Sequence, residues 1–107
     1  MFPHIKESVE RVTEKLKKHF PERIIAIYAF GSRVRGDHDE WSDFDVLVLV
    51  KDKNPELVDG IIGIFADEEY EKGVPFSPVI KDITVFEKEK QYKTPFYQNI
   101  KKEGVLL

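Results

Sequence analysis

The chain has 107 residues, a length typical of one domain, and 41% of them are hydrophobic, which supports a modest core and excludes a disordered composition. The formal net charge of -3 argues against a general nucleic-acid binder, because such proteins carry a basic face. The absence of cysteine excludes disulfides and thiolate zinc sites. Charges interrupt the first ten residues, and no apolar run approaches the length of a membrane span, so we expect a cytoplasmic protein.

The first half of the chain predicts a helix followed by two buried strands. Apolar side chains at steps of three and four residues define one helix face: Ile5, Val9, Val12, Leu16 and Phe20. Pro21 ends this helix. Residues 24–30 and 46–50 are short, continuous apolar runs, which are typical of strands buried on both faces. The polar, glycine-containing stretch between them predicts a loop with a short helix.

A second helix begins at Asn54-Pro55, where Asn serves as the N-cap and Pro takes the first helical position. Its apolar spacing fades near Glu71, and Gly73 is the expected C-cap. Residues 74–80 predict a third strand, and its two prolines place it at a sheet edge.

Residues 82–86 either extend the third strand or form a short fourth strand, and the polar segment 87–94 has no assigned structure. Thr94-Pro95 opens a last short helix that Gly104 closes. The order of elements predicts an α/β (α+β) fold, with a small mixed β-sheet and helices packed on it. The aromatic side chains near the C-terminus and the final Val105-Leu106-Leu107 belong either to the core or to an apolar surface for a partner chain.

Two aspartates stand together at the start of the second strand. Residues two apart in a strand point to the same side, so Asp43 and Asp45 present two carboxylates together before a purely apolar run. Two such carboxylates are costly unless a cation or hydrogen-bond donors compensate them. Magnesium suits this pair, because it binds one or two carboxylates together with substrate phosphates.

A glycine follows the first strand directly. Gly31 lets backbone N–H groups approach a phosphate closely, and Ser32 opens the next turn. Arg33 and Arg35 either add charge to that phosphate cradle or pair with local acids. If the first two strands are antiparallel, the end of one meets the start of the other, and the phosphate loop then faces the carboxylate pair.

The Gly-Ser pair, a downstream glycine, and Ser-Asp-Phe-Asp about ten residues later resemble the signature of the DNA polymerase β nucleotidyltransferase superfamily. The length and the C-terminal stretch 95–107 resemble its minimal nucleotidyltransferases. The resemblance implies that Gly31 and Ser32 bind a nucleoside triphosphate, ATP or another, and that Asp43 and Asp45 hold Mg²⁺. It further implies transfer of a nucleoside monophosphate to a hydroxyl by in-line displacement at phosphorus.

The sequence departs from this family at a third carboxylate, which the family places near the start of a following strand. Residues 74–78 contain no acid there, and Asp82 lies five residues beyond Ser77, roughly 15 Å along an extended strand. Asp82 is therefore not assigned to the metal site. Nucleotide and metal binding remain the expectation, whereas turnover by the isolated chain is left open.

The family also implies a partner, because a chain of this length has room for the catalytic half alone. Minimal members act as antitoxins of helical HEPN-type toxins, by transferring AMP to a tyrosine of the toxin or by binding it. The first alternative is a non-catalytic module that masks a partner by contact. The second is a small-molecule adenylyltransferase that modifies antibiotics. A homo-oligomer is possible, and we expect neither membrane association nor direct binding of nucleic acid.

Overall fold

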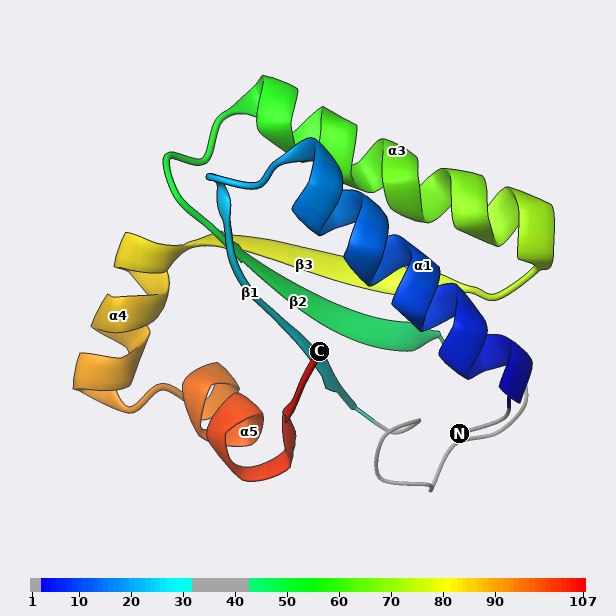
Figure 1. The fold of residues 1–107 in the computed structure, drawn as a ribbon. Coiled ribbons are helices and arrows are strands. Elements are labelled where there is room, and N and C mark those ends of the chain that lie inside the picture. Colours follow the sequence, from blue (N-terminus) through cyan, green and yellow to red (C-terminus); the bar gives the residue numbers. More distant parts are fainter. Residues whose placement is uncertain (1–2, 32–42) are drawn as a thin grey trace.

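The structure is a computed structural model that describes residues 3–31 and 43–107. The elements follow in the order α1 (Pro3–His19), β1 (Ile24–Phe30), β2 (Phe44–Val50), α3 (Pro55–Lys72), β3 (Phe76–Asp82), α4 (Ile83–Tyr92), α5 (Pro95–Glu103) and β4 (Val105–Leu106). The strands form a mixed sheet in the order β3-β2-β1-β4. Helices α1 and α3 pack on one face, and α4 and α5 pack on the other (Figure 1). The predicted fold class is confirmed.

The central strand β2 explains why its sequence shows no polar alternation. It pairs antiparallel with β1 and parallel with β3, and both of its faces are covered. Val46, Val48 and Val50 lie in the core under α1 and α3, whereas Leu47 and Leu49 lie in the core under α4 and α5. A strand between two helical layers needs apolar side chains at every position.

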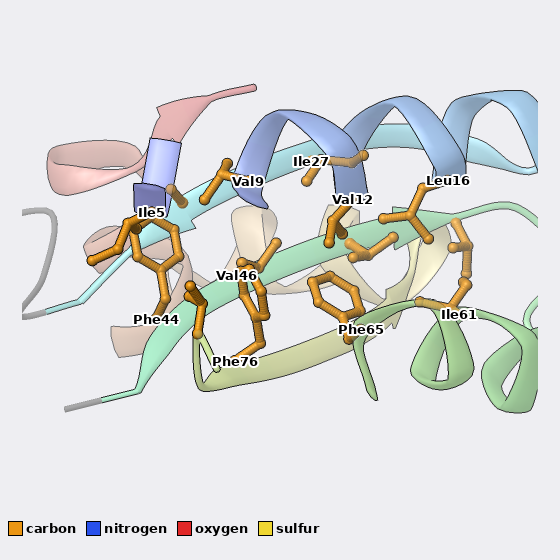
Figure 2. Packing of buried hydrophobic residues seen from close by; sticks show 14 of the residues in the cluster. Ile5, Val9, Val12, Leu16, Ile27, Phe44, Val46, Ile61, Phe65 and Phe76 are labelled. Carbon is orange, nitrogen blue, oxygen red and sulfur yellow. The ribbon is translucent and has the colours of Figure 1, made fainter. Parts of the chain in front are cut away.

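The larger core lies between the sheet and the helix pair α1 and α3 (Figure 2). The apolar face predicted for the first helix points into it, with Ile5, Val9, Val12 and Leu16 all buried. At one end of this core the ring of Phe76 makes edge-to-face contacts with Phe44 and with Phe65, at centroid distances of 6.1 and 5.4 Å. These rings fix the first residues of β2 and β3 side by side.

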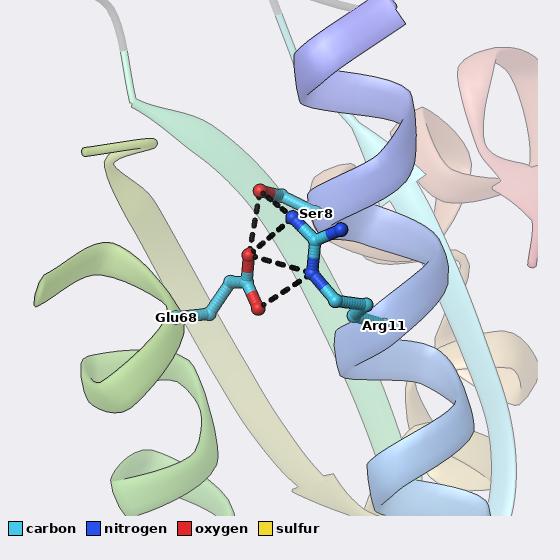
Figure 3. Close-up of polar contacts among 3 residues, drawn as sticks. All are labelled: Ser8, Arg11 and Glu68. Carbon is cyan, nitrogen blue, oxygen red and sulfur yellow. Dashed lines mark hydrogen bonds and ion pairs between the residues drawn. The ribbon is translucent and has the colours of Figure 1, made fainter. Parts of the chain in front are cut away.

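A buried ion pair also joins α1 to α3 (Figure 3). Glu68 is 1% exposed, and its Oε2 accepts hydrogen bonds from Ser8 Oγ at 2.7 Å and from an Arg11 guanidinium nitrogen at 2.9 Å. Burial alone would raise the pKa of Glu68, but the hydrogen bonds from Arg11 and Ser8 outweigh it and hold that pKa below its ordinary value. The carboxylate is therefore a charged, satisfied link between two helices.

The predicted helix signals are confirmed where side chains cap the ends. Asn54 accepts a hydrogen bond from the Leu57 amide at the start of α3, and Gly73 adopts the left-handed conformation at its end. Thr94 caps α5 in the same way, through the amide of Tyr97, and Gly104 closes that helix. Strand β3 lies at the edge of the sheet, as its prolines indicated.

The prediction of strand over residues 82–86 is correct for Asp82, which ends β3, and wrong for residues 83–86, which are helical. β3 ends at Asp82, whose carboxylate accepts hydrogen bonds from the backbone N–H and the hydroxyl of Thr84 and so begins helix α4. The β-branched residues 83–85 therefore lie in the first turn of a helix, because the N-cap and packing against the sheet override their strand preference. Most of segment 87–94 continues this helix.

The C-terminal residues divide between the two roles that the sequence left open. The short β4 pairs with β1, with Leu106 opposite Tyr28 and Val105 opposite Ala29. Val105 and Leu106 are exposed, whereas Leu107 is partly buried against the larger core. Within residues 3–31 and 43–107, no helix combines the length and the apolar character needed to cross a membrane.

Candidate functional site

The two aspartates lie at the start of β2 on the sheet face opposite Phe44. Phe44 is buried in the core under α1 and α3, so alternation along the strand directs Asp43 and Asp45 to the other face. Asp43 precedes the strand and is exposed, and Asp45 is half-buried within it. The two carboxylates thus share one side of the chain at the end of an otherwise apolar strand.

The end of β1 lies directly against Asp45. The antiparallel register pairs Phe30 with Asp45, and Gly31 follows with a φ of +86°. A Cβ atom added to Gly31 would lie 2.1 Å from Oδ2 of Asp45, closer than any stable contact. The backbone of Gly31 therefore approaches the carboxylate in a way that only glycine permits.

Strand β3 brings a serine beside Asp45, within the stretch 74–78 that contains no acid. The parallel register pairs Ser77 with Asp45, so both side chains lie on the same face of the sheet. Asp82 pairs with Val50 at the far end of β2. The pKa of Asp82 is lowered to about 2 by hydrogen bonds from the Lys53 amide and from Thr84, which identifies it as a helix cap. It stands apart from the aspartate pair.

Three further predicted site residues, Ser32, Arg33 and Arg35, lie outside the described residues. Among the residues that the structure does describe, His, Cys, Asp and Glu side chains form no group of three or more that could hold a metal ion. Asp43 and Asp45 are thus a two-carboxylate donor set. That set fits Mg²⁺, which retains positions for water and for phosphate oxygens of a substrate.

Sequence reasoning missed an aromatic residue beside this site. Phe96, in the first turn of α5, makes an edge-to-face contact with Phe30, with ring centroids 5.7 Å apart. Phe30 is the register partner of Asp45, so the sheet brings α5 close to the aspartates. The contact spans 66 positions of sequence, and no local pattern indicates it.

Comparisons with known proteins agree with the fold. The sequence profile of the nucleotidyltransferase domain family matches residues 9–107. A protein of Methanocaldococcus jannaschii, provisionally named a protein adenylyltransferase, is 34% identical over 103 residues, covering 94% of this chain and 92% of the relative. A second protein from that organism with the same kind of name is 28% identical over 101 residues, covering 94% and 95%.

The fold is also found in a crystal structure of a toxin-antitoxin with AMP-PNP. The TM-score is 0.57 at 19% sequence identity, and the match covers 91% of this chain and 70% of that chain. On the family match over residues 9–107, this chain belongs to the nucleotidyltransferase domain family.

Proposed function

We propose that the chain transfers AMP from ATP to a hydroxyl group of a partner protein. The observation that carries this proposal is the placement of Asp45 between Gly31 and Ser77, with Asp43 on the same side of β2. Family membership supports nucleotidyl transfer. The names of the two relatives support AMP as the transferred group and a protein as the acceptor.

The proposed roles follow from residue chemistry. Asp43 and Asp45 hold Mg²⁺, and Gly31 and Ser32 bind the triphosphate through the backbone and the hydroxyl. Arg33 and Arg35 add positive charge to the phosphate groups. When bound, Mg²⁺ neutralises charge on the phosphate oxygens during displacement.

The reaction is an in-line displacement at the α-phosphorus. An acceptor hydroxyl oxygen forms a bond to that phosphorus, the bond to the bridging oxygen of the β-phosphate breaks, and pyrophosphate leaves. The hydroxyl proton must pass to a base. Beside Asp45 the adjacent strand offers the hydroxyl of Ser77 in place of a carboxylate, so we assign proton acceptance to solvent or to a group on the acceptor protein.

A helical HEPN-type toxin is the partner that we propose, with this chain as its antitoxin. The toxin-antitoxin crystal structure that shares the fold motivates this choice. Ile25 of β1 and Val105 and Leu106 of the neighbouring edge strand β4 are exposed apolar residues, and such side chains at a sheet edge support a protein partner.

One observation favours a second candidate, a module that binds the partner without transferring AMP. Ser77 stands in register with Asp45, near the start of the strand on which the family resemblance implies a third acid. Under this alternative the fold and nucleotide binding persist, and neutralisation of the toxin requires contact alone. A variant without both aspartates would then still neutralise the partner.

Calorimetric titration of Mg-ATP into the purified chain tests the nucleotide site. We expect the wild type to bind and Asp43→Asn/Asp45→Asn to lose binding. Asp59→Asn/Asp67→Asn, which removes two exposed acids of α3, is the matched control and should bind as the wild type does. Absence of binding in the wild type, or equal binding by both double variants, would contradict the proposed site.

Transfer itself is tested with ATP labelled at the α-phosphate and the proposed HEPN-type partner, which the family resemblance implies is encoded by the neighbouring gene. Label on the partner that depends on Asp43 and Asp45 supports adenylylation. Neutralisation of the partner without label, and without dependence on the two aspartates, favours the contact module instead.

A further inference from the structure

One row of side chains crosses three strands on the face that α4 and α5 cover. Ser77, Asp45 and Phe30 are register partners across β3, β2 and β1, so they stand side by side on this face. The neighbouring positions of β2 on the same face, Leu47 and Leu49, are buried under α4 and α5. The row of Ser77, Asp45 and Phe30 therefore lies at the edge of the area that α4 and α5 cover. There the Asp45 carboxylate is next to the ring of Phe30.

Phe96 extends this row into an aromatic surface. Its ring contacts Phe30 edge-to-face at 5.7 Å, and the Lys81 ammonium lies 4.0 Å from the centroid of the same ring. Phe96 is only partly buried, so it is not enclosed in the smaller core. Directly opposed residues of antiparallel strands have Cβ atoms about 5 Å apart, so the aromatic surface begins one side chain away from Asp45.

A polar network holds Phe96 in place. Lys81 forms an ion pair with Glu89, and Thr94 Oγ1 donates to the other carboxylate oxygen of Glu89 at 2.9 Å. Thr94 is the N-cap of α5, and its hydroxyl oxygen accepts a hydrogen bond from the amide of Tyr97. The first turn of α5, which carries Phe96, is thereby tied to both β3 and α4.

We propose that Phe96, supported by Phe30 and Lys81, packs against the base of the nucleotide whose phosphates lie at Asp43 and Asp45. This inference rests on the proposed function, and it adds a residue that contacts the ligand at the end remote from the reacting phosphorus. A ring fixed in place loses little entropy when a base stacks on it, and stacking on an aromatic side chain is favourable for any base. The same contacts also make Phe96 part of the smaller core, so the test must separate ligand binding from packing.

The experiment compares two ligands that differ in the base. Mg-ATP and Mg-tripolyphosphate are titrated into the wild type, Phe96→Leu and Phe96→Tyr, and thermal unfolding of each variant is measured in parallel. Leucine keeps the apolar volume but removes the aromatic face, and tyrosine keeps that face. We expect Phe96→Leu to raise the Kd for Mg-ATP about tenfold and to leave the Kd for Mg-tripolyphosphate unchanged. Phe96→Tyr should bind Mg-ATP as the wild type does.

Tyr92→Leu is the matched control, because Tyr92 is an aromatic residue of the adjacent helix that is 75% exposed. It should leave both Kd values unchanged. Equal Mg-ATP binding by wild type and Phe96→Leu, or an equal loss for both ligands, would overturn the base contact while leaving the proposed function intact. No Mg-ATP binding by the wild type would remove the proposed function and this inference with it.

Discussion

At the scale of single residues, the geometry of Gly31 and Asp45 is the tightest constraint on the site. Glycine is needed at position 31 for two separate reasons, a positive φ and the lack of room for a Cβ beside the Asp45 carboxylate. Gly73 shares the first reason only, because an added Cβ there would meet nothing within 4 Å. Comparing alanine substitutions at the two glycines therefore distinguishes the cost of a strained backbone from the effect of a steric collision.

Replacing Gly31 with alanine should disturb the site more than the fold. Gly31→Ala and Gly73→Ala should each destabilise the chain by about 1 kcal/mol, because a positive φ is strained for any residue that has a Cβ. Only Gly31→Ala should weaken Mg-ATP binding, by tenfold or more, because its Cβ forces the Asp45 carboxylate to move. Urea unfolding and calorimetry measure the two effects, and unchanged Mg-ATP binding by Gly31→Ala would contradict the contact.

Short sequence patterns predicted the candidate site residues that lie close together in the chain. They did not predict residues whose contacts come from elements far apart in the chain. Asp43, Asp45 and Gly31 were predicted because a strand's alternation and a following glycine are visible in a few letters. The partial burial of Phe96 against Phe30 and the burial of Glu68 depend on how helices pack, which no short pattern contains. Glu68 lies in a run of three acids, and only its position facing α1 distinguishes it from the exposed Asp67 and Glu69.

Glu68 also yields a stability prediction. In Glu68→Gln the amide can still accept from Ser8, and Arg11, whose side chain is 37% exposed, can turn to water, so a cost of about 1–2 kcal/mol is expected. Glu68→Ala should cost about 3 kcal/mol, because it leaves a fully buried Ser8 hydroxyl without its acceptor and opens a cavity. Urea denaturation measures both, and equal costs would show that the hydrogen bond to Ser8 contributes nothing.

At the scale of elements, the boundary between β3 and α4 shows why local propensity failed. Ile83, Thr84 and Val85 favour strands, yet Asp82 caps a helix that begins at Ile83 and takes all three into its first turn. The Asp82 carboxylate also accepts from the Lys53 amide, so one side chain fixes both the loop after β2 and the start of α4. The sequence shows an aspartate that could cap a helix, followed by a β-branched run that favours a strand. Packing against the sheet decides that the helix forms.

The Asp82 cap predicts a specific acid dependence of stability. Its pKa is lowered from 3.8 to about 2 in the folded chain, so the carboxylate stabilises the fold above pH 4, and this stabilisation is lost as the pH falls from 3.8 towards 2. Asp82→Asn keeps a capping oxygen without the charge. The wild type should therefore unfold at a higher temperature than Asp82→Asn at pH 7, and the difference should vanish near pH 2.

Thermal unfolding between pH 2 and pH 7 measures this difference. Asp59→Asn, at an exposed position of α3, is the control for loss of one negative charge. A difference between wild type and Asp82→Asn that stays constant across the whole range would exclude the ionised cap as its cause.

At the scale of the whole molecule, the two helical layers differ in what they cover. Helices α1 and α3 enclose the larger core, whereas α4 and α5 cover the face that carries the aspartates and leave Asp45 only half-buried. Two-residue β4 leaves exposed apolar side chains at the sheet edge opposite β3. Nucleotide and partner would thus meet different parts of one small surface.

A substitution at Leu106 distinguishes partner binding from nucleotide binding. This residue is 65% exposed, so Leu106→Lys should leave thermal stability and Mg-ATP binding unchanged, but it should weaken the complex with the neighbouring gene's product by tenfold or more, since it places a charge in an apolar contact. Tyr70→Lys on α3, at a position 91% exposed and across the sheet from β4, is the matched control and should bind the partner normally. Surface plasmon resonance with the purified partner measures both Kd values. Full affinity in Leu106→Lys would place the partner elsewhere on the molecule, and joint loss of partner and Mg-ATP binding would mean that β4 supports the nucleotide site instead.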